Sequence, residues 1–237
     1  QLVNFIAMTF GSKLFGPEVF GQYMFVNSVS LTLAVVMCLR GDHFILAKDK
    51  LDLEKTINTF ISISLSILAM VLFLVFILGV VSSNYKFTAL VSLGVLMGFV
   101  NSNFQLLGSS LIKTEKLKAF SFSAVIKPMV MCIGQLIVFA LAPLFSLAMV
   151  LPRFVGDLSA AAARYFSIKN ERFAFETKKI SFIKENYTYC IVGTLASFLN
   201  IFSQQLPMLI LPALFGYTSL GYFSLAFSLV VIPMTLL

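Results

Sequence analysis

Long apolar segments alternate with short polar ones along the whole chain. The segment FISISLSILAMVLFLVFILGVV (60–81) is apolar on every side, as a helix surrounded by lipid and by other helices would be. A hydrocarbon core of about 30 Å requires about 20 such residues, whereas a membrane β-barrel would show alternating strands of about 10 residues. The pattern therefore predicts an all-α, polytopic membrane protein. Its eight expected helices cover residues 1–13, 20–39, 56–81, 87–108, 119–142, 144–163, 187–214 and 221–237.

The composition also favours lipid as the solvent. Hydrophobic residues fill 59% of the 237 positions and charged residues 11%, which is more apolar surface than a soluble domain of this length buries. The chain starts within one hydrophobic segment, with no basic leader, and ends within another, so we expect it to be part of a longer protein. Cys38, Cys132 and Cys190 lie in separate apolar segments, and His43 has no partner at metal-ligand spacing. No disulfide, metal or other cofactor is expected.

Basic residues gather in alternate connections. Thirteen of the 17 Lys and Arg residues lie in the connections 40–55, 113–118 and 164–186, which the positive-inside rule assigns to the cytoplasm. The net charge of +7 thus reports orientation, and nucleic acid is not an expected partner because these connections lack aromatic platforms for bases. The connection 164–186 mixes aromatic and basic residues. It suits either an amphipathic helix lying on the cytoplasmic leaflet or a solvated linker.

One glycine-containing segment occurs twice, 200 positions apart. LFGPEVFGQY (14–23) and LFGYTSLGYF (214–223) share Leu, Phe and two Gly at equivalent positions. Six expected crossings separate the copies, so both lie on one face, outside. We expect two parallel six-helix lobes around a central cleft, a layout found in secondary transporters; chance recurrence of a glycine turn is the alternative. The predicted domains are an N-terminal lobe (1–163), a cytoplasmic amphipathic connector (164–186) and the start of a C-terminal lobe (187–237).

Three stretches carry a resemblance to a known family. QLVNFIAMTFGSKLFGPEVFGQY with LRGDHFILAKDKLDLEKTI, and LASFLNIFSQQLPMLILPALFGYTSLGYFSLAFSLVVIP, resemble segments of the O-antigen and capsule flippases of the multidrug/oligosaccharidyl-lipid/polysaccharide exporter superfamily. At Gly41-Asp42-His43 the chain departs from the family, in which an aromatic residue and a longer acid are usual.

The resemblance implies twelve or more helices in the bacterial inner membrane and a transporter rather than an enzyme. The implied cargo is an undecaprenyl-pyrophosphate-linked oligosaccharide, with membrane lipids and glycan assembly proteins as further partners.

Three charged residues lie well inside expected helices, where each costs about 2.5–3.5 kcal/mol to insert. Lys127 precedes Pro128, and Arg153 and Asp157 share a helix face at i and i+4. Lys127 and Arg153 are candidates for binding a pyrophosphate, and Asp157 for holding Arg153 or exchanging a coupling proton. In the alternative interpretation, Lys127 snorkels to the headgroups and Arg153 with Asp157 is a structural pair.

Two further pairs are weaker candidates. Asn200 and Gln204 share a helix face at i and i+4 and are suited to sugar contacts or to plain interhelical hydrogen bonding. Arg40 and Asp42 form either a gate pair or an instance of the positive-inside rule.

Other functions remain open at this stage. A drug/cation antiporter and a peptidoglycan-precursor flippase of the same fold are alternatives. A membrane glycan polymerase is disfavoured, because no catalytic constellation occurs and the expected outside connections are short.

Overall fold

The structure, a computed structural model, is all-helical throughout the part of the chain that it describes. It describes residues 2–48, 52–141, 147–168 and 179–236, with side chains for 15–48, 52–141, 147–168 and 182–228. The helices are α1 (Leu2–Cys38), α2 (Gly41–Ala47), α3 (Leu53–Ser82), α4 (Tyr85–Lys113), α5 (Leu117–Leu141), α6 (Val150–Ile168), α7 (Lys179–Glu185), the π-helical turn η1 (Thr188–Gly193) and α8 (Thr194–Leu236). The prediction of an all-α protein is confirmed.

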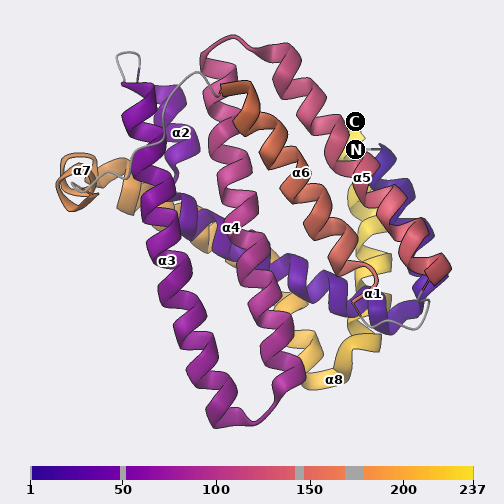
Figure 1. Cartoon of the computed structure of the whole chain (residues 1–237). Helices are drawn as coiled ribbons and strands as arrows, with labels where there is room; N and C mark the ends of the chain where they lie inside the picture. Colours follow the sequence, from indigo (N-terminus) through magenta and orange to yellow (C-terminus); the bar gives the residue numbers. More distant parts are fainter. Residues whose placement is uncertain (1, 49–51, 142–146, 169–178, 237) are drawn as a thin grey trace.

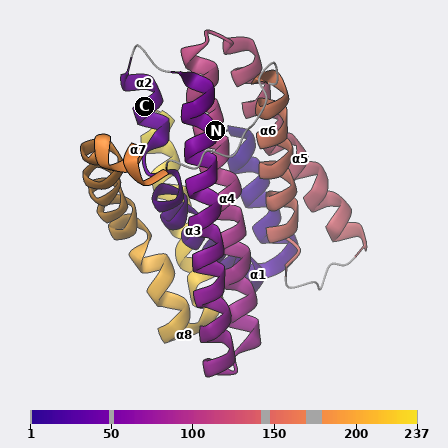
Figure 2. The same cartoon turned by 60° about the vertical axis from the view of Figure 1, so that its left-hand side comes forward.

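Helices α3 to α6 form a row, and the long helices α1 and α8 lie across one side of it (Figures 1 and 2). Phe20 and Tyr23 of α1 share a buried core with Met208 and Leu220 of α8. Side chains of α4 and α5 complete that core, including Met97 and Met131. The expected C-terminal lobe therefore begins with a helix that packs directly on the N-terminal helices.

Five helical segments in the described part of the chain are long and apolar enough to cross a membrane: 15–38, 53–82, 85–113, 117–141 and 188–228. The remaining helix of the row, α6, does not meet this description, because its 19 residues include Arg153, Asp157 and Arg164. The protein is therefore membrane-embedded by length and composition of its helices, and the count of eight crossings stays a prediction.

Sharp bends divide both long helices at equivalent glycines. Gly16 in α1 has φ 80° and ψ 169°, and Gly216 in α8 has φ 79° and ψ 171°. This left-handed region suits glycine because it has no Cβ to clash. The two arms of α1 correspond to the expected helices 1–13 and 20–39. The expected helices 187–214 and 221–237 correspond to η1 with the first arm of α8 and to its second arm.

Side-chain caps fix where two of the spanning helices begin. The Asp52 carboxylate accepts the backbone N–H of Lys55 at 3.3 Å, and the Asn84 side chain accepts that of Phe87 at 3.2 Å. Each cap satisfies one of the N–H groups that lack an intrahelical partner at a helix start. The same hydrogen bond from Lys55 lowers the pKa of Asp52, which lies outside the membrane spans.

The basic connections meet at one end of the bundle. Lys48 donates to Asn186 at 2.6 Å, Lys113 donates to the Lys48 carbonyl, and Lys116 donates to the Ser167 carbonyl at 3.0 Å. We call this the basic end; it is the upper end in Figure 1. At the opposite end, Lys86 after the α3–α4 turn lies 3.9 Å from Glu18, beside the Gly16 bend. Alternate connections therefore share an end, whereas the cytoplasmic assignment of the basic end stays a prediction.

The connector 164–186 differs from its sequence-based description at two points. Arg164 is a buried residue of α6, 3% exposed, because that helix continues to Ile168. Phe182 packs edge-on against Phe44 and Phe60, with ring centroids 5.5 and 5.4 Å apart, so this ring faces protein rather than a lipid leaflet. Residues 169–178 of the connector lie outside the described residues.

Candidate functional site

An ionic group lies between α5 and α6. Asp157, 1% exposed, is held by two cations: Lys127 Nζ is 2.7 Å from its Oδ1, and Arg153 Nε is 3.2 Å from its Oδ2. The three charged residues singled out in the sequence therefore come together at one place. The i, i+4 spacing accounts for Arg153 with Asp157, while Lys127 arrives from the neighbouring helix.

Tyr23 connects this group to α1. Arg153 Nη1 donates to the Tyr23 hydroxyl at 3.0 Å, and Tyr23 is completely buried. The Lys127 and Arg153 side chains keep 16% and 12% of their surface exposed. All four side chains are therefore largely buried, Asp157 and Tyr23 more completely than the two cations.

Arg164 is the residue that sequence reasoning missed. Its guanidinium lies 3.4 Å from the centroid of the Phe104 ring and 4.8 Å from that of Phe120. It donates to Ser123 Oγ at 2.8 Å and also to the Phe104 carbonyl. The Phe104 ring is shared with Lys127, whose Nζ is 5.1 Å from the same centroid. Cation–π contacts of this kind stabilise partly desolvated cations, so Arg164 belongs to the same charged region.

Two glycines, which have no Cβ, leave the space that this arrangement needs. A Cβ on Gly156 of α6 would lie 2.8 Å from the Lys127 carbonyl of α5, and a Cβ on Gly108 of α4 would overlap Arg164 Nη1. The first glycine lets α5 and α6 approach until Lys127 reaches Asp157. The second leaves room for the guanidinium beside α4.

We expect Gly156→Ala to lower stability by about 1–3 kcal/mol, because the added methyl group forces two packed helices apart. Gly193→Ala is the matched control, since its nearest atom would be at 3.6 Å. Thermal unfolding of both variants in the same detergent checks this. Equal unfolding temperatures for the two variants would show that the α5–α6 contact tolerates the change.

The cationic cluster, defined as Lys127, Arg153, Asp157 and Arg164 with Tyr23, carries three cations against one carboxylate. The formal excess of two positive charges lies in a region of low dielectric, where it attracts an anion more strongly than it would in water. Arg and Lys together are suited to phosphate, Arg through two parallel N–H groups and Lys as a point charge. Among the described residues, no group of three or more His, Cys, Asp or Glu side chains could hold a metal ion.

The other four predicted site residues lie away from the cluster's hydrogen bonds and ion pairs. Asn200 and Gln204 are exposed on α8, where Gln204 Nε2 donates to Asn200 Oδ1 at 3.2 Å. Arg40 and Asp42 make no ion pair with each other. Arg40 has a left-handed φ of 55° at the break between α1 and α2, and Asp42 lies 3.6 Å from His43 and accepts a weak contact from Cys38 at 4.0 Å.

The two copies of the repeated segment contact each other directly. A Cβ on Gly21 would overlap the Tyr217 carbonyl oxygen, and a Cβ on Gly221 would overlap the Pro17 carbonyl oxygen. Gly21 corresponds to Gly221, and Pro17 to Tyr217, in the 200-residue repeat. The contact is thus reciprocal, as across a local two-fold axis. We call it the glycine crossing.

These features define the class of protein: an all-helical, membrane-embedded chain with a buried cationic cluster and an internally symmetric crossing of two bent helices. No protein-family model, curated protein or solved structure matches the chain.

Proposed function

We propose that the protein is a flippase that moves an undecaprenyl-pyrophosphate-linked oligosaccharide, such as an O-antigen or capsule repeat unit, across the bacterial inner membrane. The observation that carries this proposal is the cationic cluster. Lys127 and Arg153 lie against a single carboxylate, and Arg164 shares the Phe104 ring with Lys127, so the cluster has the excess of positive charge that a pyrophosphate requires. The resemblance of both ends of the chain to polysaccharide flippases supports the same cargo.

Alternating access is the mechanism that accompanies this function. The glycine crossing joins two equivalent segments beside Glu18 and Lys86, at the end opposite the basic connections. In the proposed orientation this is the outer face, and the crossing closes it. Rocking of two lobes about such a contact would expose the cargo site to each side in turn.

The charges of the cluster separate this proposal from a drug/cation antiporter. An antiporter for cationic drugs requires acidic groups facing its cargo, whereas Asp157 is the cluster's one carboxylate and is already paired with two cations. A peptidoglycan-precursor flippase moves the same pyrophosphate chemistry and stays the second candidate.

Complementation tests the proposal. Expressed in a strain that lacks its own O-antigen or capsule flippase and carries matching glycan genes, the protein should restore surface glycan to more than half of the wild-type amount. A strain depleted of its peptidoglycan-precursor flippase serves as the comparison. Growth of that strain without recovery of surface glycan in the first would favour the second candidate, and recovery in neither strain would contradict a flippase function.

A further inference from the structure

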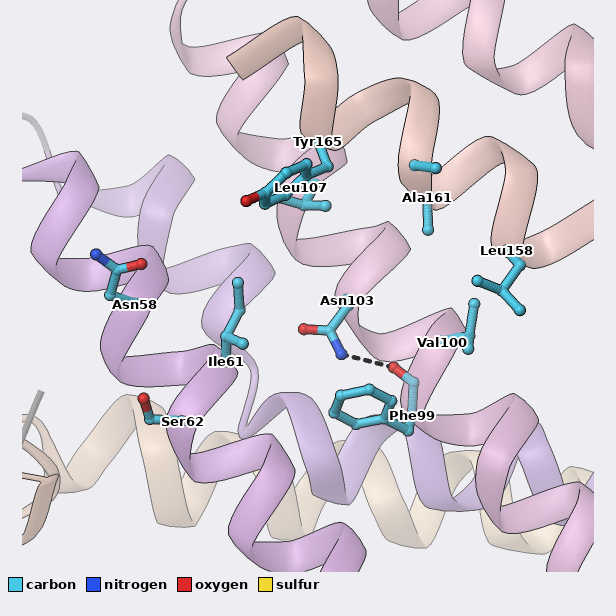
Figure 3. Close-up of a pocket in the computed structure, with 11 residues that line it drawn as sticks. Asn58, Ile61, Ser62, Phe99, Val100, Asn103, Leu107, Leu158, Ala161 and Tyr165 are labelled. Atoms are coloured by element: carbon cyan, nitrogen blue, oxygen red, sulfur yellow. Dashed lines mark hydrogen bonds between the residues drawn. The ribbon is translucent and has the colours of Figure 1, made fainter. Parts of the chain in front are cut away.

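A cavity lies between α3, α4 and α6, separate from the cationic cluster. It has a volume of about 480 Å³, within the range of about 300–1,000 Å³ that is usual for small-molecule sites. Leu158, Ala161 and Tyr165 face it from α6 (Figure 3), whereas Asp157 and Arg164 of the same helix contact α5 and α4. Helix α6 therefore presents different faces to the two sites.

Two amides at this cavity have unused hydrogen-bonding groups. Asn58 of α3 is 5% exposed, lines the cavity and makes no hydrogen bond in the structure. Asn103 of α4 donates from Nδ2 to the Phe99 carbonyl at 2.8 Å, but its buried Oδ1 has no partner. Figure 3 shows this oxygen on the side of Asn103 that faces α3 and Ile61. A buried amide oxygen nearly always has a donor, so Asn103 Oδ1 favours a ligand that donates a hydrogen bond, and the Asn58 amide can both donate and accept.

The remaining lining restricts the charge of that ligand. None of the residues that line the cavity is charged, so it offers no cation for a phosphate and no carboxylate for an ammonium group. Phe99, Val100 and Leu158 supply apolar surface. The lining therefore suits a neutral molecule with a hydroxylated head and an apolar chain.

The depth of these groups orients the ligand. Asn58 is five residues from the start of α3, roughly 8 Å from the basic end at about 1.5 Å per residue. Phe99 is 14 residues from Lys113, where α4 ends at the basic end, and so lies roughly 21 Å from that end at the same rise per residue. Hydroxyl groups would thus meet the amides nearer the surface, and the chain would extend toward Phe99.

We propose that the cavity between α3, α4 and α6 binds a neutral alkyl glycoside, with the sugar hydroxyl groups on Asn58 and Asn103 and the alkyl chain against Phe99, Val100 and Leu158. This inference stands on the cavity alone and does not depend on the cargo of the cationic cluster.

The absence of tryptophan from the sequence allows a direct test. Phe99→Trp puts a single indole at the cavity of the full chain, reconstituted in phosphatidylcholine vesicles. Dodecyl glucoside brominated in its chain should quench the indole emission saturably, by at least twofold. Brominated dodecyl phosphocholine and brominated dodecyl trimethylammonium carry the same chain with charged heads and should quench without saturation.

Substitution of the two amides completes the test. Asn58→Leu with Asn103→Leu, in the Phe99→Trp chain, should weaken glucoside binding at least tenfold, whereas Ser203→Leu, at an exposed polar residue of α8, should not. If Phe99→Trp fails to fold, Leu158→Trp is the second reporter, since Leu158 lines the cavity and is 45% exposed. Equal saturable quenching by the phosphocholine probe, or unchanged glucoside affinity in the double variant, would overturn the proposal and identify a groove for bulk lipid chains.

Discussion

Arg153→Ala should reduce glycan export roughly 10- to 100-fold at unchanged protein abundance. The proposed cargo loses a charge-assisted hydrogen bond of about 1.5–3 kcal/mol, while Asp157 keeps Lys127 at 2.7 Å and so is not left unpaired. Glycan export by Arg153→Lys should lie between that of Arg153→Ala and that of the wild type, because lysine keeps the charge and loses the paired N–H groups. Export of surface glycan in the complemented strain is the measurement. Lys86→Ala, at a 64% exposed cation of the opposite end, is the control.

A second substitution separates cargo binding from a structural role. If Arg153 serves only to neutralise Asp157, then Asp157→Asn should rescue Arg153→Ala, because the carboxylate that required a partner is gone. If Arg153 contacts the cargo, the double variant should stay as inactive as Arg153→Ala. Rescue to wild-type export would therefore contradict the cargo role and leave a structural ion pair.

Gly21→Val and Gly221→Val should each stop transport and lower thermal stability by similar amounts. Either side chain would overlap a backbone carbonyl of the other helix, and helices that cross at small residues in membranes do so because their backbones approach closely. The double variant should lose less stability than the sum of the two, because one substitution already separates the helices. Unfolding temperatures and surface-glycan assays of the three variants measure this.

The Gly21→Val and Gly221→Val variants test whether the glycine crossing is symmetric. A reciprocal contact requires the two single variants to behave alike, with Gly193→Ala as an uncrowded glycine for reference. Strong loss in one variant and a neutral result in the other would show that the glycine crossing is not symmetric in the working protein.

The cationic cluster could be predicted in part from the sequence. The spacing of Arg153 and Asp157 defines a shared helix face whatever the tertiary structure, and a charge within an apolar segment draws attention to Lys127. Tyr23 could not be found in this way, because its contact with Arg153 depends on how α1 packs against α6. Nothing local distinguishes it from other tyrosines in apolar segments.

Its charge places Arg164 at the start of the predicted basic connector 164–186. A signal for the opposite assignment was present: positions 153, 157, 160 and 164 continue one helical face, and the residues between are small or apolar. Helical periodicity predicts a helix beyond residue 163, as the structure has it to Ile168.

The number of helices was harder to predict than their positions. The sequence predicts separate helices on either side of both copies of the repeat, and in the structure two helical arms meet at a non-helical glycine at each copy, with no loop between them. Sequence patterns do not distinguish a bend from a connection, since both use glycine for the same conformational reason.

The glycine crossing also explains how little the two copies of the repeat need to share. Gly21 and Gly221 meet main-chain atoms of Tyr217 and Pro17, and a main chain is the same whatever side chain it bears. The contact therefore restricts Gly21 and Gly221 to glycine and sets no requirement of its own on the side chains of residues 17 and 217, which are Pro in one copy and Tyr in the other. Two segments joined in this way can carry different side chains at other positions without losing the main-chain fit that holds them together.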